Sequence, residues 1–394
     1  MVNEVHAPPP LDRRKRIILS VLAATFLFAS IEAMFFAAGK VLERKWGMWR
    51  AAEPAADYPR SFESYMEVRN PIFGWPYPMQ YGDSLAKNGA LVNTHYLDAP
   101  LEKACISLYG DSFTEGGDIS SPDKRWSDLL SASLNCYVAN FAMGGHGTDQ
   151  AYLRFETRAD DKAPLTILGF HTADVTRNLT RIRDLEIYAQ HFALKPRFVL
   201  NQEGDIDLVP IPILTYDEYL RAVGAKKPFL NIEHETMQPG GPSGAVALTF
   251  PYSLAVIKNA LFYYRFRARV GRYPEWMPFL QEGHPMHGLE ITAGISRKFA
   301  ELAESRGKKS LILILPHPED FIYYQRTKVW TYSALVERHK KDGLAMADFG
   351  PYLIARAEER KMPLQAFFGP TQHYNDEGNA EVARFVLSVM GSRP

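Results

Sequence analysis

Short apolar runs and amphipathic stretches alternate along the chain from about residue 101 onward. The apolar runs predict buried strands, and the stretches between them have the apolar spacing of helices. We expect strands at 105–109, 137–141, 165–170, 310–315 and 345–349. We expect helices at 125–134, 149–158, 289–306, 332–341, 352–360 and 377–390. Strands and helices in this alternation favour a parallel sheet covered on both faces, which is an α/β fold.

A longer apolar run lies near the amino terminus. Residues 17–39 are apolar except for Ser20, Thr25, Ser30 and Glu32, and a run of this length can cross a bilayer as a helix. A cleaved signal peptide would have a shorter apolar core, so we expect an uncleaved, single-pass anchor. Basic residues lie on both sides of the run, at 13–16 and at 40–50, so the positive-inside rule does not decide its orientation.

Two segments do not follow the alternation. Residues 41–100 contain many prolines, which prevent long helices, and we interpret them as a linker and an irregular extension. Residues 178–288 are rich in aromatic side chains and too long for a plain loop. They predict an insertion that forms either a lid or acceptor platform, or a small core of its own. The predicted organisation is a cytoplasmic tail and anchor at 1–40, the extension, and one domain at 101–394.

Composition excludes several classes of function. Lys plus Arg and Asp plus Glu number 45 each, so no net charge favours nucleic acid. The histidines lack the spacing of a metal site, and two cysteines cannot build a cysteine-rich zinc site, so we expect no metal. The glycine-rich run 144–147 lacks the Lys-Ser/Thr of a phosphate-binding loop, and we expect no cofactor.

The first predicted strand leads directly into a candidate nucleophile. Residues 105–109 are followed by Gly110, Asp111 and Ser112, which break the strand into a polar loop. Ligands bind at the carboxyl ends of the strands in open α/β sheets, and N–H groups at a following helix start can stabilise an anion. Ser112 therefore lies where a nucleophilic serine would be useful.

Two further blocks accompany this one. The run 140–150, which includes Gly144 and Gly145, follows the second predicted strand, and the run 373–379 opens the last helix. The three blocks, in this order, resemble the SGNH (GDSL) hydrolase family of esterases, lipases, thioesterases and carbohydrate O-acyl esterases or transferases. The resemblance covers about 101–390 and implies a three-layer fold with a five-stranded parallel sheet in the flavodoxin-like order 2-1-3-4-5.

The resemblance assigns the general base to His373. A serine hydroxyl needs a base to remove its proton, and the histidine that opens the last helix does this in the family. The family's aspartate three residues earlier is replaced here by Pro370. Either a backbone carbonyl or Thr371 orients the ring, or a distant carboxylate such as Glu319 or Asp320 does so.

The resemblance also implies the groups that would stabilise an oxyanion. These are the backbone N–H groups of Ser112 and Gly145, and in the family an asparagine side chain after the third strand. Here Ala173 or Asp174 stands in its place, depending on alignment. An ionised Asp174 would oppose the oxyanion, whereas a buried, neutral one could donate a hydrogen bond. The side chains that could substitute are His146, His171 and Asn178.

The implied sheet order makes the strands of Cys105 and Cys136 neighbours, which predicts a disulfide between them; two buried free thiols are the alternative. A disulfide and an anchor together favour an extracytoplasmic, periplasmic domain on the inner or cytoplasmic membrane. The predicted function is a membrane-anchored serine esterase or O-acyltransferase that acts on acyl groups, acetyl foremost, of an envelope or secreted glycan. The alternative is a non-catalytic module that binds glycan or an integral-membrane acyltransferase partner.

Overall fold

The centre of the molecule is a parallel β-sheet. The computed structural model describes residues 12–46, 69–74, 84–183, 194–212, 215, 232–238 and 241–391. Five strands pair in the order β2-β1-β3-β6-β7, so the predicted order 2-1-3-4-5 is confirmed. Their bounds are Ala104–Tyr109 for β1, Tyr137–Asn140 for β2, Leu165–His171 for β3, Lys309–Leu315 for β6 and Met346–Asp348 for β7. Each lies within two residues of its predicted bounds, because a buried strand appears in the sequence as an apolar run.

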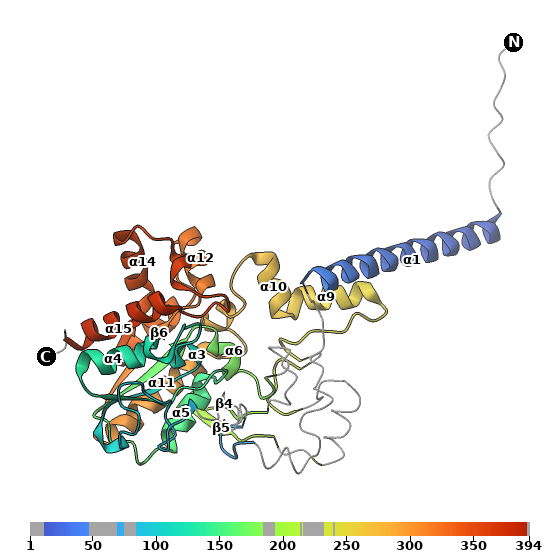
Figure 1. Cartoon of the computed structure of the whole chain (residues 1–394). Helices are drawn as coiled ribbons and strands as arrows, with labels where there is room; N and C mark the ends of the chain where they lie inside the picture. Colours follow the sequence, from blue (N-terminus) through green and yellow to red (C-terminus); the bar gives the residue numbers. More distant parts are fainter. Residues whose placement is uncertain are drawn as a thin grey trace.

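Successive side chains of each strand enter two different cores. In β6, Leu311, Leu313 and Leu315 pack on one face, and Ile312 and Ile314 pack on the other. This is the two-residue period of a pleated strand. Helices cover both faces, as Figure 1 shows. On one face lie α4 (Trp126–Leu134), α14 (Phe349–Glu359) and α15 (Asp376–Gly391), and on the other lie α5 (Thr148–Glu156) and α11 (Gly288–Ser305).

Shorter elements complete the domain. The connection from β6 to β7 contains two helices, α12 (Pro318–Thr327) and α13 (Ser333–Lys341). The predictions did not include α12. Two short helices follow the carboxyl ends of strands, α3 (Ser112–Glu115) after β1 and α6 (Asp174–Asn178) after β3. The 3-10 turns are η3 (Leu101–Lys103), η4 (Pro122–Lys124), η5 (Met277–Leu280) and η6 (Leu364–Phe367).

The two cysteines join neighbouring strands. Cys105 lies in β1 and Cys136 directly precedes β2, and the structure links them in a disulfide with 6.1 Å between their Cα atoms. The β1–β2 register shifts between Ala104 and Ile106. Cys105 is the residue between these two, where the register changes.

The segment 178–288 contains separate secondary structure, as an insertion would. A two-stranded antiparallel sheet joins β4 (Arg197–Leu200) to β5 (Ile206–Val209). The helices α9 (Tyr252–Phe262) and α10 (Tyr264–Gly271) follow. Tyr263 and Tyr264 pack into the core of the main domain, whereas Phe250 and Phe262 are exposed. Several aromatic residues on which the lid prediction depends, at 188, 192, 216, 219 and 229, lie outside the described residues.

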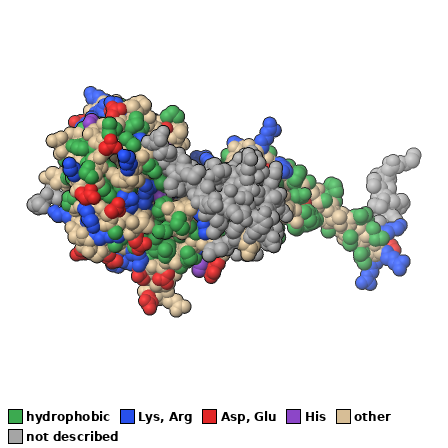
Figure 2. Space-filling view, turned by 60° about the horizontal axis from the view of Figure 1, so that its bottom comes forward, with side chains coloured by type: hydrophobic (Ala, Val, Ile, Leu, Met, Phe, Trp, Pro, Cys, Tyr) green, Lys and Arg blue, Asp and Glu red, His purple; other side chains and the backbone are tan. Residues whose placement is uncertain are grey.

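The amino-terminal helix α1 (Arg13–Trp46) is long and apolar enough to cross a membrane. It projects from the domain, and Figure 2 shows apolar side chains exposed on the projecting part, with basic side chains at the far end. Its carboxyl-terminal part lies beside α9 (Figure 1). α1 ends at Trp46, inside the predicted extension at 41–100, because the helix continues past the apolar run. The rest of the extension is described at 69–74 and 84–100, where Leu91 N–H donates to the carbonyl of Asn140 at the end of β2.

Candidate active site

The end of β1 positions Ser112. After Tyr109 the chain passes through Gly110, where a Cβ would lie 2.2 Å from Thr114 Oγ1 and 2.8 Å from the carbonyl oxygen of Gly169. Only glycine therefore fits at this turn. Asp111 then caps α3, because its Oδ1 accepts from the N–H of Phe113 at 2.9 Å. Ser112 follows as the first residue of α3, and it is partly exposed at the carboxyl edge of the sheet.

The start of the last helix positions His373. Asn375 precedes α15, and its Oδ1 accepts from the N–H of Gly378 at 3.1 Å, which holds the loop against the helix. The amide of Asn379 donates to the carbonyl of Tyr374 at 2.7 Å. On the opposite side, a Cβ at Gly117 would lie 2.9 Å from His373 Cγ. A glycine there is what allows the histidine to approach the loop after α3.

Ser112 and His373 lie within hydrogen-bond distance of each other. Ser112 Oγ is 2.7 Å from His373 Nε2, and His373 Nδ1 is 2.8 Å from Thr371 Oγ1. Thr371 Oγ1 in turn donates to Asp118 Oδ1 at 2.7 Å. With the proton on Nδ1, every donor in this series has an acceptor, since Ser112 donates to Nε2, Nδ1 donates to Thr371 and Thr371 donates to the carboxylate. We call these four residues the Ser112–Asp118 relay.

Asp118 also holds the backbone of the histidine loop. Its Oδ2 accepts from the N–H groups of Thr371 and His373, both at 3.0 Å. The same oxygen is 3.9 Å from His373 Nδ1, too far for a direct hydrogen bond. The carboxylate therefore acts on the imidazole through the Thr371 hydroxyl and through the shape of the loop.

Burial favours the neutral form of His373, which is the form that can accept a proton. Burial lowers its pKa below the ordinary value of 6.5, while the negative charges of Asp111 and Asp118 oppose that decrease. The imidazole is therefore neutral at neutral pH, which is the form that a general base requires.

Sequence reasoning missed Asp118, which lies six residues after Ser112 behind two glycines. The only available signal was Pro370, which shows that the usual orienting residue is absent. Of the alternatives, Thr371 contacts the ring. Asp320 is bound elsewhere, since it accepts from Trp276 Nε1 at 2.9 Å and from the hydroxyls of Thr172 and Thr331. Of the alternatives left open, the structure therefore does not support Asp320, and the carboxylate that reaches His373 through Thr371 is that of Asp118.

Glu319, the other distant carboxylate considered, has different neighbours. Burial and the nearby Glu275 raise its pKa, and Arg269 opposes this increase. It borders a surface hollow together with Arg269 and Tyr323. The carboxylate bonded to Thr371 is that of Asp118.

Two backbone N–H groups remain free for an oxyanion. Among the residues that the structure describes, the N–H groups of Ser112 and Gly145 have no hydrogen-bond acceptor. Gly145 has a φ of 81°, a conformation that glycine adopts without strain. Ser112 and Gly145 as oxyanion donors stay a prediction, supported by these free groups.

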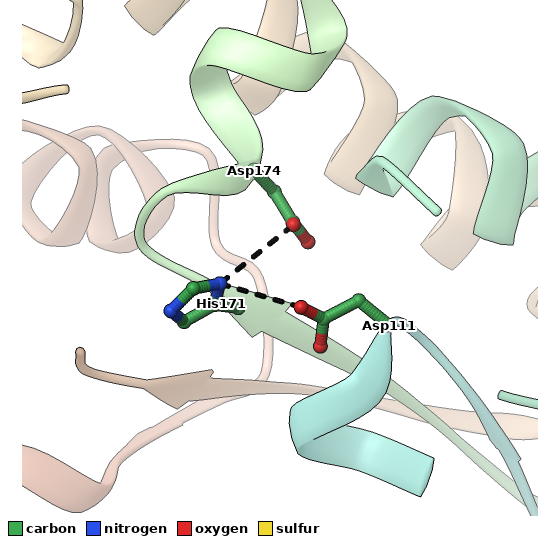
Figure 3. Close-up of side chains that lie close together, drawn as sticks. All are labelled: Asp111, His171 and Asp174. Carbon is green, nitrogen blue, oxygen red and sulfur yellow. Dashed lines mark ion pairs between the residues drawn. The ribbon is translucent and has the colours of Figure 1, made fainter. Parts of the chain in front are cut away.

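A second polar cluster lies behind Ser112, and it is buried. Arg177 Nη1 lies 2.8 Å from Asp111 Oδ2 and 2.8 Å from Asp174 Oδ1, and it donates to the carbonyl of His146 at 2.8 Å. His171 Nδ1 is 3.3 Å from Asp111 Oδ2 and 3.9 Å from Asp174 Oδ1. Figure 3 shows the two carboxylates and the imidazole converging from the ends of β1 and β3. We call Asp111, His171, Asp174 and Arg177 the Arg177 cluster.

The charges of this cluster largely compensate each other. Burial alone would raise the pKa of Asp111, but His171, Arg177 and the N–H of Phe113 bring it below its usual range. Burial and the charge of Asp111 raise the pKa of Asp174 well above its usual range. Burial lowers the pKa of His171 to about 4. The cluster therefore pairs one carboxylate with one guanidinium, beside a neutral imidazole and a neutral acid.

The possible substitutes for the third oxyanion donor lie in several environments. Asp174 Oδ2 is 3.4 Å from Thr148 Oγ1, so both its carboxyl oxygens have partners inside the protein. Asn178 is buried and bonds to Asp149 N–H and to Thr292. His146 is fully buried against Phe73. The third donor stays a prediction for Asp174 and for Ala173, and the same holds for the auxiliary role of His146 and His171.

The Arg177 cluster also contains the side chains most suited by distance to hold a metal. The ligand atoms of Asp111, His171 and Asp174 lie within 4.8 Å of one another. Arg177 already places a positive charge between the two carboxylates. A cation would have to displace this guanidinium, so the arrangement is that of a buried ion pair and not of a metal centre.

A parallel α/β sheet with a hydrogen-bonded serine and histidine at its carboxyl edge is an arrangement suited to acyl transfer. No protein-family model matches the sequence, and no curated protein matches it either. Similar solved structures include a member of the lipolytic protein G-D-S-L family from Veillonella parvula DSM 2008. It has 12% identity and a TM-score of 0.36, with 73% of this chain and 98% of that chain covered.

Two further solved structures are also similar to this chain. A GDSL-like lipase from Bacteroides thetaiotaomicron VPI-5482 has 12% identity and a TM-score of 0.36, with 80% of this chain and 98% of that chain covered. An acetyl xylan esterase has 11% identity and a TM-score of 0.33, with 72% of this chain and 98% of that chain covered. Likenesses of this size establish no activity for the chain.

Proposed function

We propose that the chain is a membrane-anchored serine esterase or O-acyltransferase of the SGNH type, which acts on acyl groups, acetyl foremost, of an envelope or secreted glycan. One observation carries the proposal: a partly exposed serine hydroxyl lies 2.7 Å from the Nε2 of a histidine whose pKa is lowered. A serine in this position can lose its proton to the imidazole as it attacks an ester.

The proposed reaction has two halves. In the first, Ser112 Oγ attacks the ester carbonyl carbon while its proton moves to His373 Nε2. The oxyanion is bound by the N–H groups of Ser112 and Gly145, and the imidazolium is stabilised through Thr371. The tetrahedral intermediate then breaks its bond to the alcohol, which takes the proton from His373 and leaves an acyl-serine.

In the second half, another hydroxyl group attacks the carbonyl carbon of the acyl-serine while His373 removes its proton. The bond from that carbon to Ser112 Oγ then breaks, and the serine takes the proton back from His373. Water yields a free acid, and a sugar hydroxyl yields a new ester. Chemically the two outcomes differ only in which acceptor reaches the acyl-serine first.

Membrane attachment in the proposal depends on α1 remaining part of the mature chain. Glu32, in the apolar run of α1, is buried against the loop and helix at Ser253, which supports retention of the helix. The disulfide between Cys105 and Cys136 supports a position outside the cytoplasm, where disulfides persist. Attachment at a membrane would favour a substrate fixed in the envelope over a freely diffusing one.

The test is labelling of the full chain with a fluorophosphonate, followed by peptide mapping. We expect an adduct on Ser112 that is absent in Ser112→Ala. We also expect turnover of a short-chain aryl acetate to fall about 10⁴-fold or more in Ser112→Ala and in His373→Ala. A folded chain that is neither labelled nor active would contradict the proposal and favour a non-catalytic glycan-binding or partner-binding module. An added sugar acceptor that captures the acetyl group would distinguish transfer from hydrolysis.

A further inference from the structure

A second apolar segment lies along the amino-terminal helix. Residues 245–262 comprise a loop and α9, and apolar side chains of this segment pack against α1. Phe250 lies 6.1 Å from Phe28 between ring centroids, and Tyr252 lies 4.8 Å from Phe36. A Cβ at Gly39 would lie 2.7 Å from the methyl carbons of Leu248. In Figure 1, α9 runs alongside the carboxyl-terminal part of α1, and α10 lies between α9 and the rest of the domain.

A polar contact is buried within this apolar interface. The Oε2 atom of Glu32 accepts from the N–H of Ser253 at 3.2 Å, and its Oε1 atom accepts from the hydroxyl of the same serine. Glu32 is only 4% exposed. Ser253 lies in the first turn of α9, where N–H groups have no partner within the helix and a negative charge is favourable. The carboxyl group that interrupts the apolar run is therefore bound within its own chain.

The position of Glu32 along α1 determines the depth of this contact. The apolar run 17–39 is about 34 Å long at a rise of about 1.5 Å per residue, close to the ~30 Å of a bilayer's hydrocarbon core. Glu32 lies seven residues before the end of the run, which is about 10 Å along the helix axis. If α1 spans the membrane, the first turn of α9 lies below the membrane surface by about that depth.

α9 carries an apolar surface that is uncovered in the described structure. Its exposed large side chains, Leu254, Ile257, Leu261 and Phe262, are 46–58% accessible. Phe250 in the preceding loop is 63% accessible beside its contact with Phe28. An apolar surface of this kind is typical of a contact with protein or membrane. Lys258, the one charged residue in α9, is exposed, and its long chain can carry the ammonium group toward the headgroups.

Two side chains bond to backbone groups of this segment. The fully buried Asn259 accepts from the N–H of Val246 at 2.9 Å and donates to the carbonyls of Val246 and Ala255, both at 2.8 Å. Glu32 accepts from the N–H of Ser253. Partners of this kind are what non-helical backbone needs at membrane depth.

Basic side chains follow the segment where the membrane surface would lie. Arg267, Arg269 and Arg272 are exposed in and after α10. On α1, Lys40 and Arg44 follow the apolar run. Cations at this level are attracted to anionic headgroups, which makes a lipid surface the occupant that this charge pattern fits.

We propose that residues 245–262 form a re-entrant hairpin that enters the membrane leaflet on the side of the catalytic domain, with lipid acyl chains against the outer face of α9. This inference rests on the membrane span proposed for α1. The chain is then held at two elements, so the catalytic domain keeps one face toward the membrane instead of rotating freely on a single helix.

The test uses the full chain in vesicles of phosphatidylcholine with a smaller share of phosphatidylglycerol. The native cysteines form a disulfide, so a thiol-reactive, environment-sensitive fluorophore reaches a single introduced cysteine. Leu254→Cys and Leu261→Cys report on α9, and Phe26→Cys reports on the span of α1. Leu208→Cys is the matched control, since this leucine is 43% exposed on β5, outside the segment.

We expect lipids with a spin label on the acyl chain to quench the Leu254 and Leu261 labels several-fold more than the Leu208 label. Aqueous iodide should show the reverse order. The Leu254 label should be the deeper of the two, because the amino-terminal end of α9 lies at Glu32. Iodide quenching of Leu254 equal to that of Leu208, with Phe26 in lipid, would overturn the hairpin and leave the span intact.

Two other outcomes would also overturn the inference. If the Phe26 label is open to iodide, the proposed anchor itself has failed. If the Leu254 label is protected in native membranes but open to iodide in pure lipid vesicles, a membrane protein covers α9 in place of lipid.

Discussion

The Ser112–Asp118 relay and the Arg177 cluster lie on two sides of the same turn, and they differ in their access to water. The His373 side chain is 24% exposed, whereas those of Asp111 and Asp174 are fully buried. The relay has a donor and an acceptor at each step and ends at a partly exposed hydroxyl. A proton can therefore pass between the relay and a reactant, while the cluster compensates its charges internally.

This difference suggests separate roles for the two groups. Arg177 connects the loop after β1 with the loop after β3 through two carboxylates. Removing a partner from a buried ion pair leaves a charge without compensation and costs stability. Removing a member of the relay leaves a partly solvated group, which costs little stability but changes how well the histidine accepts a proton. The substitutions below test this separation.

Arg177→Met should have the largest effect on stability. It leaves the carboxyl groups of Asp111 and Asp174 together without a cation, and we expect a loss of about 3–5 kcal/mol in the free energy of unfolding. Equilibrium unfolding of the chain by urea, in detergent, measures this loss. The control is Arg338→Met, which removes an exposed pair with Asp342 and should cost no more than about 1 kcal/mol. Equal losses in both variants would mean that the cluster is not a structural ion pair.

Asp118→Asn should reduce activity with little change in stability. A positioned base contributes about 10²–10⁴ in rate, and we expect a loss of about 10²-fold in kcat/KM when its orientation is disturbed. Protonated His373 cannot accept from Ser112, so activity falls as the pH falls through the pKa of His373, which lies below 6.5. The charge of Asp118 raises this pKa, so the variant's acidic midpoint should move to lower pH. A pH profile of kcat/KM measures the midpoint, with the exposed Asp123→Asn as control.

An unchanged midpoint in Asp118→Asn would show that the carboxylate does not act on the histidine. A large loss of stability with an unchanged midpoint would assign Asp118 to the loop alone, through its bonds to the N–H groups of Thr371 and His373.

Thr371→Val should have a smaller effect on activity. It keeps the shape of the side chain but removes the hydroxyl between His373 and Asp118, and the loss of one such bond is worth about tenfold in rate. Thr371→Ser restores a hydroxyl and should recover most of kcat. Steady-state kinetics on an aryl acetate compare the two variants. If the serine variant is as slow as the valine variant, a hydroxyl alone does not support the histidine, and the methyl group of Thr371 is needed to hold it in place.

Asp174→Asn should have the smallest effect. The asparagine keeps nearly the same volume and can still accept from Arg177, and it mimics the neutral acid that burial favours. If Asp174 stands in the family's asparagine position, esterase activity should rise by a few-fold, most at high pH, where the native carboxyl is ionised. If Ala173→Asn gives the gain instead, that residue is the equivalent. No gain in either folded variant would exclude this loop as the source of a donor.

The sequence by itself determined the five strands of the parallel sheet and six of the helices around it, because each of these carries its own period in consecutive residues. It also indicated Ser112 and His373, since both directly follow or precede an element whose end is visible in the pattern. Glu32 was visible as a carboxyl within an apolar run. These are local features, and the predicted bounds differ from the observed ones by at most three residues.

Only the tertiary structure decided which groups meet. Thr371 and Asp118 are 253 positions apart, Glu32 and Ser253 are 221 apart, and Arg177 and Asp111 are 66 apart. No period links such residues, because their contact depends on how strands and loops pack after each has formed. Asp118, in the loop after β1, reaches His373 through Thr371, since hydrogen-bond geometry constrains positions in space and not spacing along the chain.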